Sequence, residues 1–175
     1  MKRLIYLAFV ALFPMLSAAQ DVQYDNSPIS KFDLARYLGT WYEIARFDHS
    51  FERGMENVTA EYILRDDGKI DVINSGWKNG EYKVADGKAK QPEPVDDPAR
   101  LEVSFFLFFY SDYNVMMLDD AYQVALVGSE SPKYLWILSR KPTLNDAVLG
   151  LYLEEAERRG YDTGKLIWVD QSKNL

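Results

Sequence analysis

Few side chains in this sequence are of the types that usually do chemistry. The chain contains no cysteine and a single histidine, His49. A Ser-His-Asp arrangement could use only His49, and the surrounding "DHSFERG" does not read as a nucleophile turn. The acidic pairs in "DDGK" and "VDD" lie in predicted turns, and the His/Cys spacing of a metal site is missing. We therefore expect no enzyme, no metal site and no cofactor, and we expect His49 to be a solvated loop residue.

Length and charge limit the number of domains and the kinds of partner that this protein can have. A chain of 175 residues with a net charge of −7 at pH 7 is expected to form one domain, or at most two. An acidic surface repels phosphate backbones, so nucleic acid is not an expected partner. Aromatic residues make up 14% of the chain, which is enough to build a core without disulfides.

The first residues have the order of a secretory signal peptide. Lys2 and Arg3 precede a short apolar run, residues 4–16, and small residues follow at 17–19. We expect cleavage after Ala19, a flexible lead-in at residues 20–30 and a single domain at 31–175. Bacterial lipoproteins carry their lipid on a cysteine just after the signal peptide, and Gln20 stands there. The sequence therefore predicts a soluble, unanchored product in the periplasm or outside the cell.

The chain after a short helical turn at 31–38 is patterned as strands. Alternating apolar and β-branched segments are separated by turn signals such as "DDGK" and "KNGE". The period then changes, because an amphipathic helix is predicted to start at a Thr143 cap and to end at Gly160. The predicted strands are 39–47, 58–65, 70–77, 82–90, 99–109, 113–118, 123–128 and 134–140, with a last short strand at 165–169.

Three motifs in this order resemble the signatures of the lipocalins, and in particular the bacterial lipocalin and apolipoprotein D-like subgroup. They are Gly39 and Trp41 in "GTWYEIARF", Asp120 and Tyr122 in a relaxed "DDAY", and Arg140 in "WILSRKP". The resemblance runs from about residue 33 to residue 171. It implies an all-β fold, an eight-stranded antiparallel up-and-down β-barrel with a C-terminal α-helix packed on the outside. Trp41 would plug the closed end, with Arg140 lying across its indole face.

The resemblance further implies that the barrel binds and carries or stores a small hydrophobic ligand. A fatty acid or lysophospholipid is the expected class, in envelope lipid maintenance or stress. Alternation and the resemblance together place one set of residues on the inner wall. The expected ligand-binding residues are Ala60, Tyr62, Val72, Asn74, Val103, Phe105, Asn114, Met116, Val127 and Trp136, accompanied in the ring by Ile70, Leu101, Ala125 and Leu138.

Polar groups on this wall could place a headgroup. Tyr62, Asn74 and Asn114 are the candidates, and Lys83 could meet a carboxylate or phosphate near the mouth, although a solvated lysine is the commoner case. Two other readings stay open. A haem or other tetrapyrrole could bind with His49 or Tyr62 as axial ligand, or a filled barrel could serve as a protein-interaction module.

The stretch "SFFLFFY", residues 104–110, is unusually apolar for a loop region. In the expected topology it begins on the inner wall and continues into the rim of the barrel. An exposed apolar cluster usually marks a contact surface. We expect Phe106, Leu107, Phe108 and Phe109 to form an apolar lip that touches a bilayer transiently or contacts a second subunit in a homodimer.

Overall fold

The computed structural model describes residues 24–106 and 109–175. The predicted signal peptide and two residues of the predicted lip, Leu107 and Phe108, lie outside this range. The helices are α1 (Leu34–Tyr37) and α2 (Asp146–Arg158), with short 3-10 turns η1 (Thr163–Lys165) and η2 (Ser172–Asn174). The strands are β1 (Gly39–Phe47), β2 (Met55–Leu64), β3 (Ile70–Lys78), β4 (Glu81–Lys90), β5 (Arg100–Phe106), β6 (Phe109–Leu118), β7 (Val124–Gly128), β8 (Leu135–Ser139) and β9 (Leu166–Trp168).

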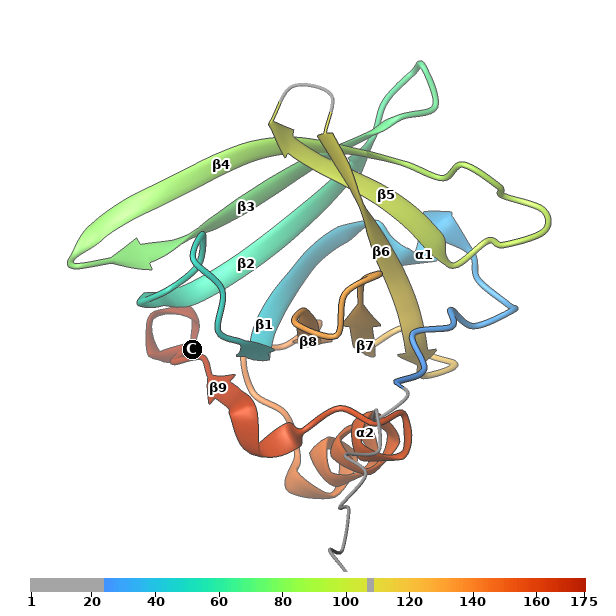
Figure 1. Cartoon of the computed structure of the whole chain (residues 1–175). Coiled ribbons are helices and arrows are strands. Elements are labelled where there is room, and N and C mark those ends of the chain that lie inside the picture. The colour runs from blue at the N-terminus through green and yellow to red at the C-terminus, as the bar shows by residue number, and fades with distance from the viewer. Residues whose placement is uncertain (1–23, 107–108) are drawn as a thin grey trace, which may run out of the picture.

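The first eight strands close into an antiparallel barrel. Each strand pairs with the next along the chain, and β1 pairs with both β2 and β8, which closes the ring. The ninth strand adds to the end of β1, from Ala45 to Phe47 (Figure 1). The predicted eight-stranded up-and-down barrel is therefore confirmed.

Two apolar clusters lie on opposite faces of the barrel wall. The inner cluster fills the closed end and includes Trp41, Leu101 and Val127. The outer cluster packs α2 against the barrel through Tyr152 and Ala156 of the helix, which meet residues of β1, β6, β7 and β8. Figure 1 shows α2 below β7 and β8. Where a helix covers the outer face of the sheet, the strands need apolar residues on both faces. The strands beneath α2 therefore show no clear alternation of apolar and polar residues.

The start of α2 and the place of the turn between β5 and β6 differ from the sequence-based prediction. The cap of α2 is Asn145, whose side chain accepts a hydrogen bond from the backbone N–H of Ala147 at 2.9 Å, and not Thr143. The predicted reversal at residues 110–112 lies inside β6, because Ser111 pairs with Val103 of β5. Phe106 of β5 instead pairs with Phe109 of β6, so the described residues of "SFFLFFY" belong to two strands.

The lead-in predicted to be flexible is held against the barrel over its described part. The backbone N–H of Asp25 donates to the carbonyl oxygen of Arg159 at 2.8 Å, and that of Ile29 donates to Val115 at 2.9 Å. The Tyr24 hydroxyl also donates to the carbonyl oxygen of Glu130. Polar composition suggested flexibility for residues 24–30, but these backbone groups find partners on α2 and β6.

The barrel wall is unevenly paired. The β3–β4 ladder joins nine residue pairs, whereas β4 and β5 are paired only at residues 88–90 of β4. The ring of Phe105 packs against Gly87 next to this short ladder. A Cβ at Gly87 would lie 2.7 Å from that ring, so the close approach requires glycine.

Candidate functional site

The closed end of the barrel is built around Trp41 and Arg140. The guanidinium carbon of Arg140 lies 3.9 Å from the centroid of the Trp41 ring. Its nitrogen atoms donate hydrogen bonds of 2.7–2.9 Å to the backbone carbonyls of Thr40, Arg36, Tyr37 and Leu38. The planar guanidinium can therefore stack on the indole and bond the chain that leads into β1 at the same time. The predicted cation–π contact is confirmed.

The turn between β6 and β7 completes this end. The carboxylate of Asp119 accepts backbone hydrogen bonds from Ala121, Gln123 and Val124. The ring of Tyr122 lies 4.0 Å from the guanidinium of Arg36, which donates to the carbonyl of Asp120. Among the expected signature residues, Asp120 thus contributes its backbone, and the neighbouring Asp119 supplies the carboxylate that shapes the turn.

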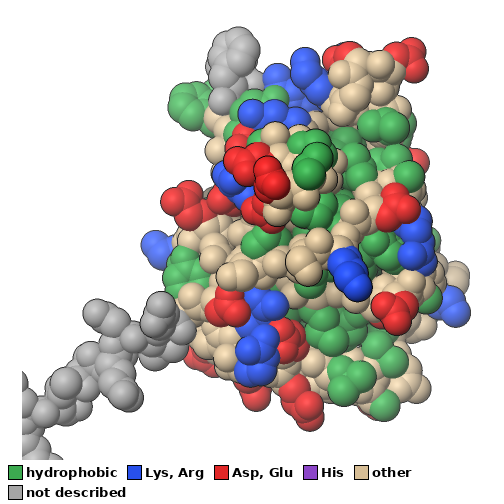
Figure 2. All heavy atoms as spheres, turned by 90° about the vertical axis from the view of Figure 1, so that its right-hand side faces the viewer, with side chains coloured by type: hydrophobic (Ala, Val, Ile, Leu, Met, Phe, Trp, Pro, Cys, Tyr) green, Lys and Arg blue, Asp and Glu red, His purple; other side chains and the backbone are tan. Residues whose placement is uncertain are grey.

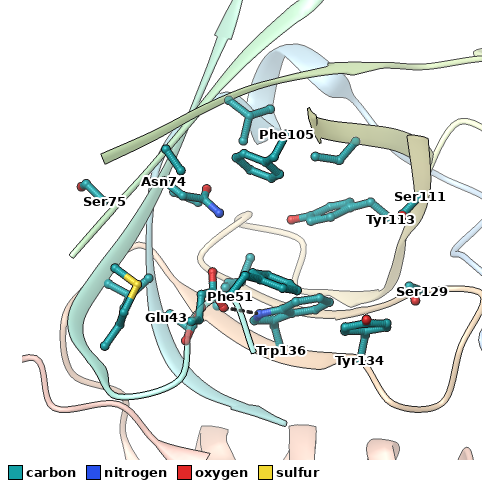
Figure 3. A pocket seen from close by; sticks show the side chains of 18 of the residues that line it. Glu43, Phe51, Asn74, Ser75, Phe105, Ser111, Tyr113, Ser129, Tyr134 and Trp136 are labelled. Atoms are coloured by element: carbon teal, nitrogen blue, oxygen red, sulfur yellow. Dashed lines mark hydrogen bonds between the residues drawn. The ribbon is translucent and has the colours of Figure 1, made fainter. Parts of the chain in front are cut away.

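Above this base lies a cavity of about 610 Å³, whose wall is mostly apolar. This volume falls in the usual range for sites that hold one small ligand. Seven of the expected ligand residues lie on its wall: Ala60, Tyr62, Val72, Asn74, Val103, Phe105 and Trp136. Figure 3 shows Asn74, Phe105 and Tyr113 on one side and Trp136, Glu43 and Phe51 across from them. Contact of these residues with a ligand stays a prediction.

Three expected ligand residues are not on the cavity wall. Val127 faces inward but belongs to the core of the closed end. Met116 faces outward, where its sulfur accepts a hydrogen bond from the Tyr161 hydroxyl at 3.6 Å. Asn114 donates to the carbonyl of Asn26 in the lead-in at 3.0 Å. The prediction for β6 was wrong by one residue, because "YNVMML" is apolar on both faces and the strand has a bulge near Val115.

The inner residues of β6 are those next to the predicted ones. Tyr113 lies on the cavity wall, and Val115 in the core of the closed end. The Tyr113 hydroxyl accepts a hydrogen bond from Tyr62 at 2.9 Å and lies 2.6 Å from the Tyr37 hydroxyl. Burial raises the pKa of all three phenols, so each keeps its proton at physiological pH. Three O–H groups form two mutual hydrogen bonds, so one O–H, of Tyr37 or of Tyr113, is not used within this chain of phenols.

Sequence reasoning also missed several other residues on the cavity wall, among them Glu43, Phe51, Glu52 and Tyr134. Glu43 is two residues from Trp41 on the same strand, so alternation from Trp41 would have placed it inward. Tyr134 is likewise two residues from Trp136 in the predicted strand 134–140, whereas Phe51 and Glu52 come from the connection between β1 and β2, where no period applies. Burial and the nearby charge of Glu52 raise the pKa of Glu43 well above its ordinary value of 4.5.

His49 is buried, in contrast to the expected solvated position. Its ring stacks on Phe51 with centroids 3.8 Å apart and packs against Trp136 at 5.3 Å. Its Nε2 lies 2.9 Å from a carboxylate oxygen of Glu52. The ring is not oriented for a hydrogen bond, and neither nitrogen has a partner among the described residues. His49 is not part of the cavity wall.

The described residues of the predicted lip are exposed at the mouth of the cavity. Phe106 is 69% exposed and Phe109 is 74% exposed, and both belong to the cavity lining. Their rings lie nearly parallel, with centroids 6.5 Å apart. Lys83 also lies at the mouth and pairs with Glu81. Figure 2 shows green hydrophobic side chains in the open between red and blue charged ones on the face that it presents.

Comparison with known proteins places this barrel in a family. A family model described as "Lipocalin-like domain" matches residues 32–171. Outer membrane lipoprotein Blc of Escherichia coli (strain K12) is 52% identical over 145 residues, which cover 82% of this chain and 81% of that protein. Apolipoprotein D of Mus musculus is 33% identical over 149 residues, which cover 81% and 78% of the two chains.

Solved structures agree on the fold. Insecticyanin from the tobacco hornworm Manduca sexta superposes with a TM-score of 0.71 at 24% identity, over 85% of this chain and 86% of that one. Apocrustacyanin C2 superposes with a TM-score of 0.67 at 18% identity, over 80% of each chain. At these identities the superpositions bear on the architecture alone.

One sequence-based prediction is contradicted by the relatives. The prediction was a soluble carrier without a lipid anchor, yet proteins that are 48–52% identical to this chain are named outer membrane lipoproteins. The residue type at position 20 was too little to support the prediction. Within residues 24–106 and 109–175, no helix is both long enough and apolar enough to cross a bilayer. Because the family model and relatives at more than 30% identity each span about four fifths of the chain, this protein belongs to the lipocalin family.

Proposed function

We propose that the cavity binds, and carries or stores, a small hydrophobic ligand with one polar end, from the class of fatty acids and lysophospholipids. The observation that supports this most directly is the cavity of about 610 Å³ inside the barrel. The ring of Trp41 and the phenols of Tyr37, Tyr62 and Tyr113 close its inner end, so the exposed mouth beside Phe106 and Phe109 is the route of entry.

Burial of the ligand chain supplies the affinity. Each methylene moved from water into an apolar cavity contributes roughly 0.8 kcal/mol. A chain that buries ten methylenes would gain about 8 kcal/mol before the costs of ordering ligand and side chains are subtracted. Micromolar binding corresponds to about 8 kcal/mol, so contacts of the polar end are needed to offset these costs.

The relatives support a role at the cell envelope. Proteins at about half identity are named outer membrane lipoproteins, and a more distant relative is named apolipoprotein D. We place this chain in the maintenance or stress response of envelope lipids, with ligand exchange at a membrane surface. The exposed rings of Phe106 and Phe109 are suited to touch a bilayer while ligand enters.

No observation favours the haem reading or the filled-barrel reading. His49 is turned toward Glu52 and away from the cavity wall, and the Tyr62 hydroxyl is engaged by Tyr113. Neither offers a free ligand atom to an iron in the cavity. A filled barrel would leave no cavity, whereas this barrel has one of about 610 Å³.

Native mass spectrometry of the protein purified from its own cell envelope tests the proposal. Bound lipids of defined mass should be retained and should be lost after organic extraction. Val103→Trp, which places an indole in the cavity, should abolish their retention. Val95→Trp, at an exposed loop position, is the matched control and should retain them. A bare mass for the parent protein, with no uptake of added fatty acid or lysophospholipid, would refute the function.

A further inference from the structure

Four charged or titratable side chains are buried together beside the cavity. They are Glu43, Arg46, His49 and Glu52, which we call the buried charge cluster, and they are exposed by 4%, 1%, 6% and 6%. The Arg46 guanidinium bonds a Glu43 oxygen at 2.5 Å and donates to the backbone carbonyl of Glu52 at 2.8 Å. The cluster therefore sets two carboxyl groups against one permanent cation.

The acidic members of the cluster face the cavity, and the basic members do not. Glu43 and Glu52 belong to the cavity wall, whereas Arg46 and His49 lie behind it. Glu52 also accepts a long hydrogen bond of 3.3 Å from the indole N–H of Trp136, drawn as a dashed line in Figure 3. A ligand at this position meets carboxyl oxygens first and is separated from the guanidinium.

Other unsatisfied groups point to a missing hydrogen-bond donor. The side-chain oxygen of Asn74 lies on the same cavity, is buried and has no partner among the described residues. His49 is nine-tenths buried, and neither of its ring nitrogens has a hydrogen-bond partner among the described residues, although Nε2 lies 2.9 Å from a Glu52 oxygen. Buried polar atoms are nearly always paired in folded proteins, so exceptions beside a cavity indicate where a ligand's polar group belongs.

Aromatic rings border the same part of the cavity. Phe51, Tyr134 and Trp136 all lie on its wall, and the last two stack with centroids 5.9 Å apart at an angle of 8°. The faces of such rings attract cations, most strongly when the cation has lost its water. Carboxyl groups and aromatic faces together form the environment that binds an ammonium group.

We propose that the ligand carries an ammonium group, held between Glu43 and Glu52 and bordered by Trp136, with its apolar chain directed toward Val72 and Val103. This inference rests on the proposed function, because it requires that the cavity binds an amphiphile. Within the class proposed above it selects lysophospholipids with an amine headgroup over simple fatty acids, whose carboxylate would be repelled by the Glu52 carboxylate.

Proton release should accompany binding. The titratable groups that face Glu43 are Arg46 on its own strand, Glu52 from the β1–β2 connection and Tyr62 from β2. Burial and the Glu52 carboxylate raise the pKa of Glu43, which favours the protonated carboxyl while the cavity is empty. An ammonium beside it stabilises the ionised form, and the proton passes to the buffer.

Calorimetric titration with laurylamine, lauryl alcohol and laurate, each kept below the concentration at which it self-associates, tests the inference. Laurylamine should bind the parent protein at least about tenfold more tightly than lauryl alcohol does. A tenfold difference in affinity corresponds to about 1.4 kcal/mol. Laurate should bind less tightly than lauryl alcohol. The heat of laurylamine binding should differ between phosphate and Tris buffers, because these buffers take up the released proton with different enthalpies.

Variants assign the preference to the two carboxyl groups. In Glu43→Gln and in Glu52→Gln the ratio of laurylamine to lauryl alcohol affinity should fall to about one, while Glu61→Gln on the exposed face of β2 should keep the parent ratio. Circular dichroism establishes that each variant is folded. Equal affinity of the parent for amine and alcohol, or a preference that survives in both cavity variants, would overturn the ammonium site alone. Failure of all three compounds to bind would overturn the proposed function together with it.

Discussion

The hydroxyl group of Tyr62 donates a hydrogen bond to the hydroxyl group of Tyr113 at 2.9 Å, and so connects β2 to β6 across the interior of the barrel. The same Tyr113 oxygen lies 2.6 Å from the hydroxyl of Tyr37, which precedes β1. Tyr113 is therefore the centre of a chain of three phenols contributed by separate parts of the sequence.

Tyr113→Phe should destabilise the fold by about 1–3 kcal/mol, because it leaves two buried hydroxyl groups without their partner. Urea unfolding followed by tryptophan fluorescence measures this change. Tyr110→Phe serves as control, since that ring lies beside Lys88 and Lys90 at the surface. Its expected effect is below about 0.5 kcal/mol. Similar losses in both variants would show that the phenol chain adds little.

Arg140→Lys should lower the free energy of unfolding by about 3 kcal/mol. A lysine ammonium cannot stack flat on Trp41 while reaching the carbonyls of Thr40, Arg36, Tyr37 and Leu38 that Arg140 bonds. Arg65→Lys, at an exposed ion pair with Asp67 and Asp71, should change it by less than about 0.5 kcal/mol. Unfolding of the two variants in denaturant measures both changes. Equal denaturant midpoints for Arg140→Lys and Arg65→Lys would contradict the structural role of Arg140.

Glu43 should make stability depend on pH. Its pKa is raised in the folded state, so above about pH 4.5 the folded chain holds a proton that the unfolded chain releases. The contribution of Glu43 to the free energy of unfolding is fully present below about pH 4.5. It declines as the pH rises from 4.5 toward the pKa of the folded state, by up to about 1.4 kcal/mol for each pH unit. Glu43→Gln cannot ionise, so its stability relative to the parent should increase over this window. Thermal unfolding at a series of pH values tests this, and parallel curves for parent and variant would refute it.

Replacement of both Phe106 and Phe109 by serine should weaken binding to lipid vesicles severalfold while the fold stays intact, because both rings are mostly exposed. Sedimentation with vesicles measures the bound fraction, and analytical ultracentrifugation reports any change in the oligomeric state. Val95→Ser removes another exposed apolar side chain, away from the mouth, and should have no effect. If the double variant binds vesicles and associates like the parent, the lip only contributes to packing within the β5–β6 hairpin.

The architecture could be predicted because its signals are local and repeated. Alternation and turn signals mark each strand, and the signature residues Trp41 and Arg140 meet as expected. Inward-facing residues were predicted well where one face of the sheet meets the cavity and the other meets solvent, as at Ala60 and Tyr62 on β2. Prediction failed at Met116 on β6, because α2 and the lead-in cover the outer face there and remove the polar half of the pattern.

The polar part of the site was harder to predict for a different reason. Glu43 follows the alternation from Trp41, but an acidic residue on an inner wall runs against the expectation of an apolar pocket. His49, Phe51 and Glu52 come from a connection whose path no period describes. Their burial depends on tertiary contacts with Trp136 and Arg46, which only the folded chain brings together.

The short ladder between β4 and β5 limits how rigid the barrel can be. Residues 81–87 of β4 have ladder partners on β3, and the pairing with β5 begins only at Lys88. Separating two strands costs less free energy when three residue pairs must be broken than when nine must be. The barrel can therefore widen most easily between β4 and β5. The width of the ligand that the barrel accepts therefore depends on how far the β3–β4 hairpin can move away from the β5–β6 hairpin. The contact of Phe105 with Gly87 holds the two hairpins together.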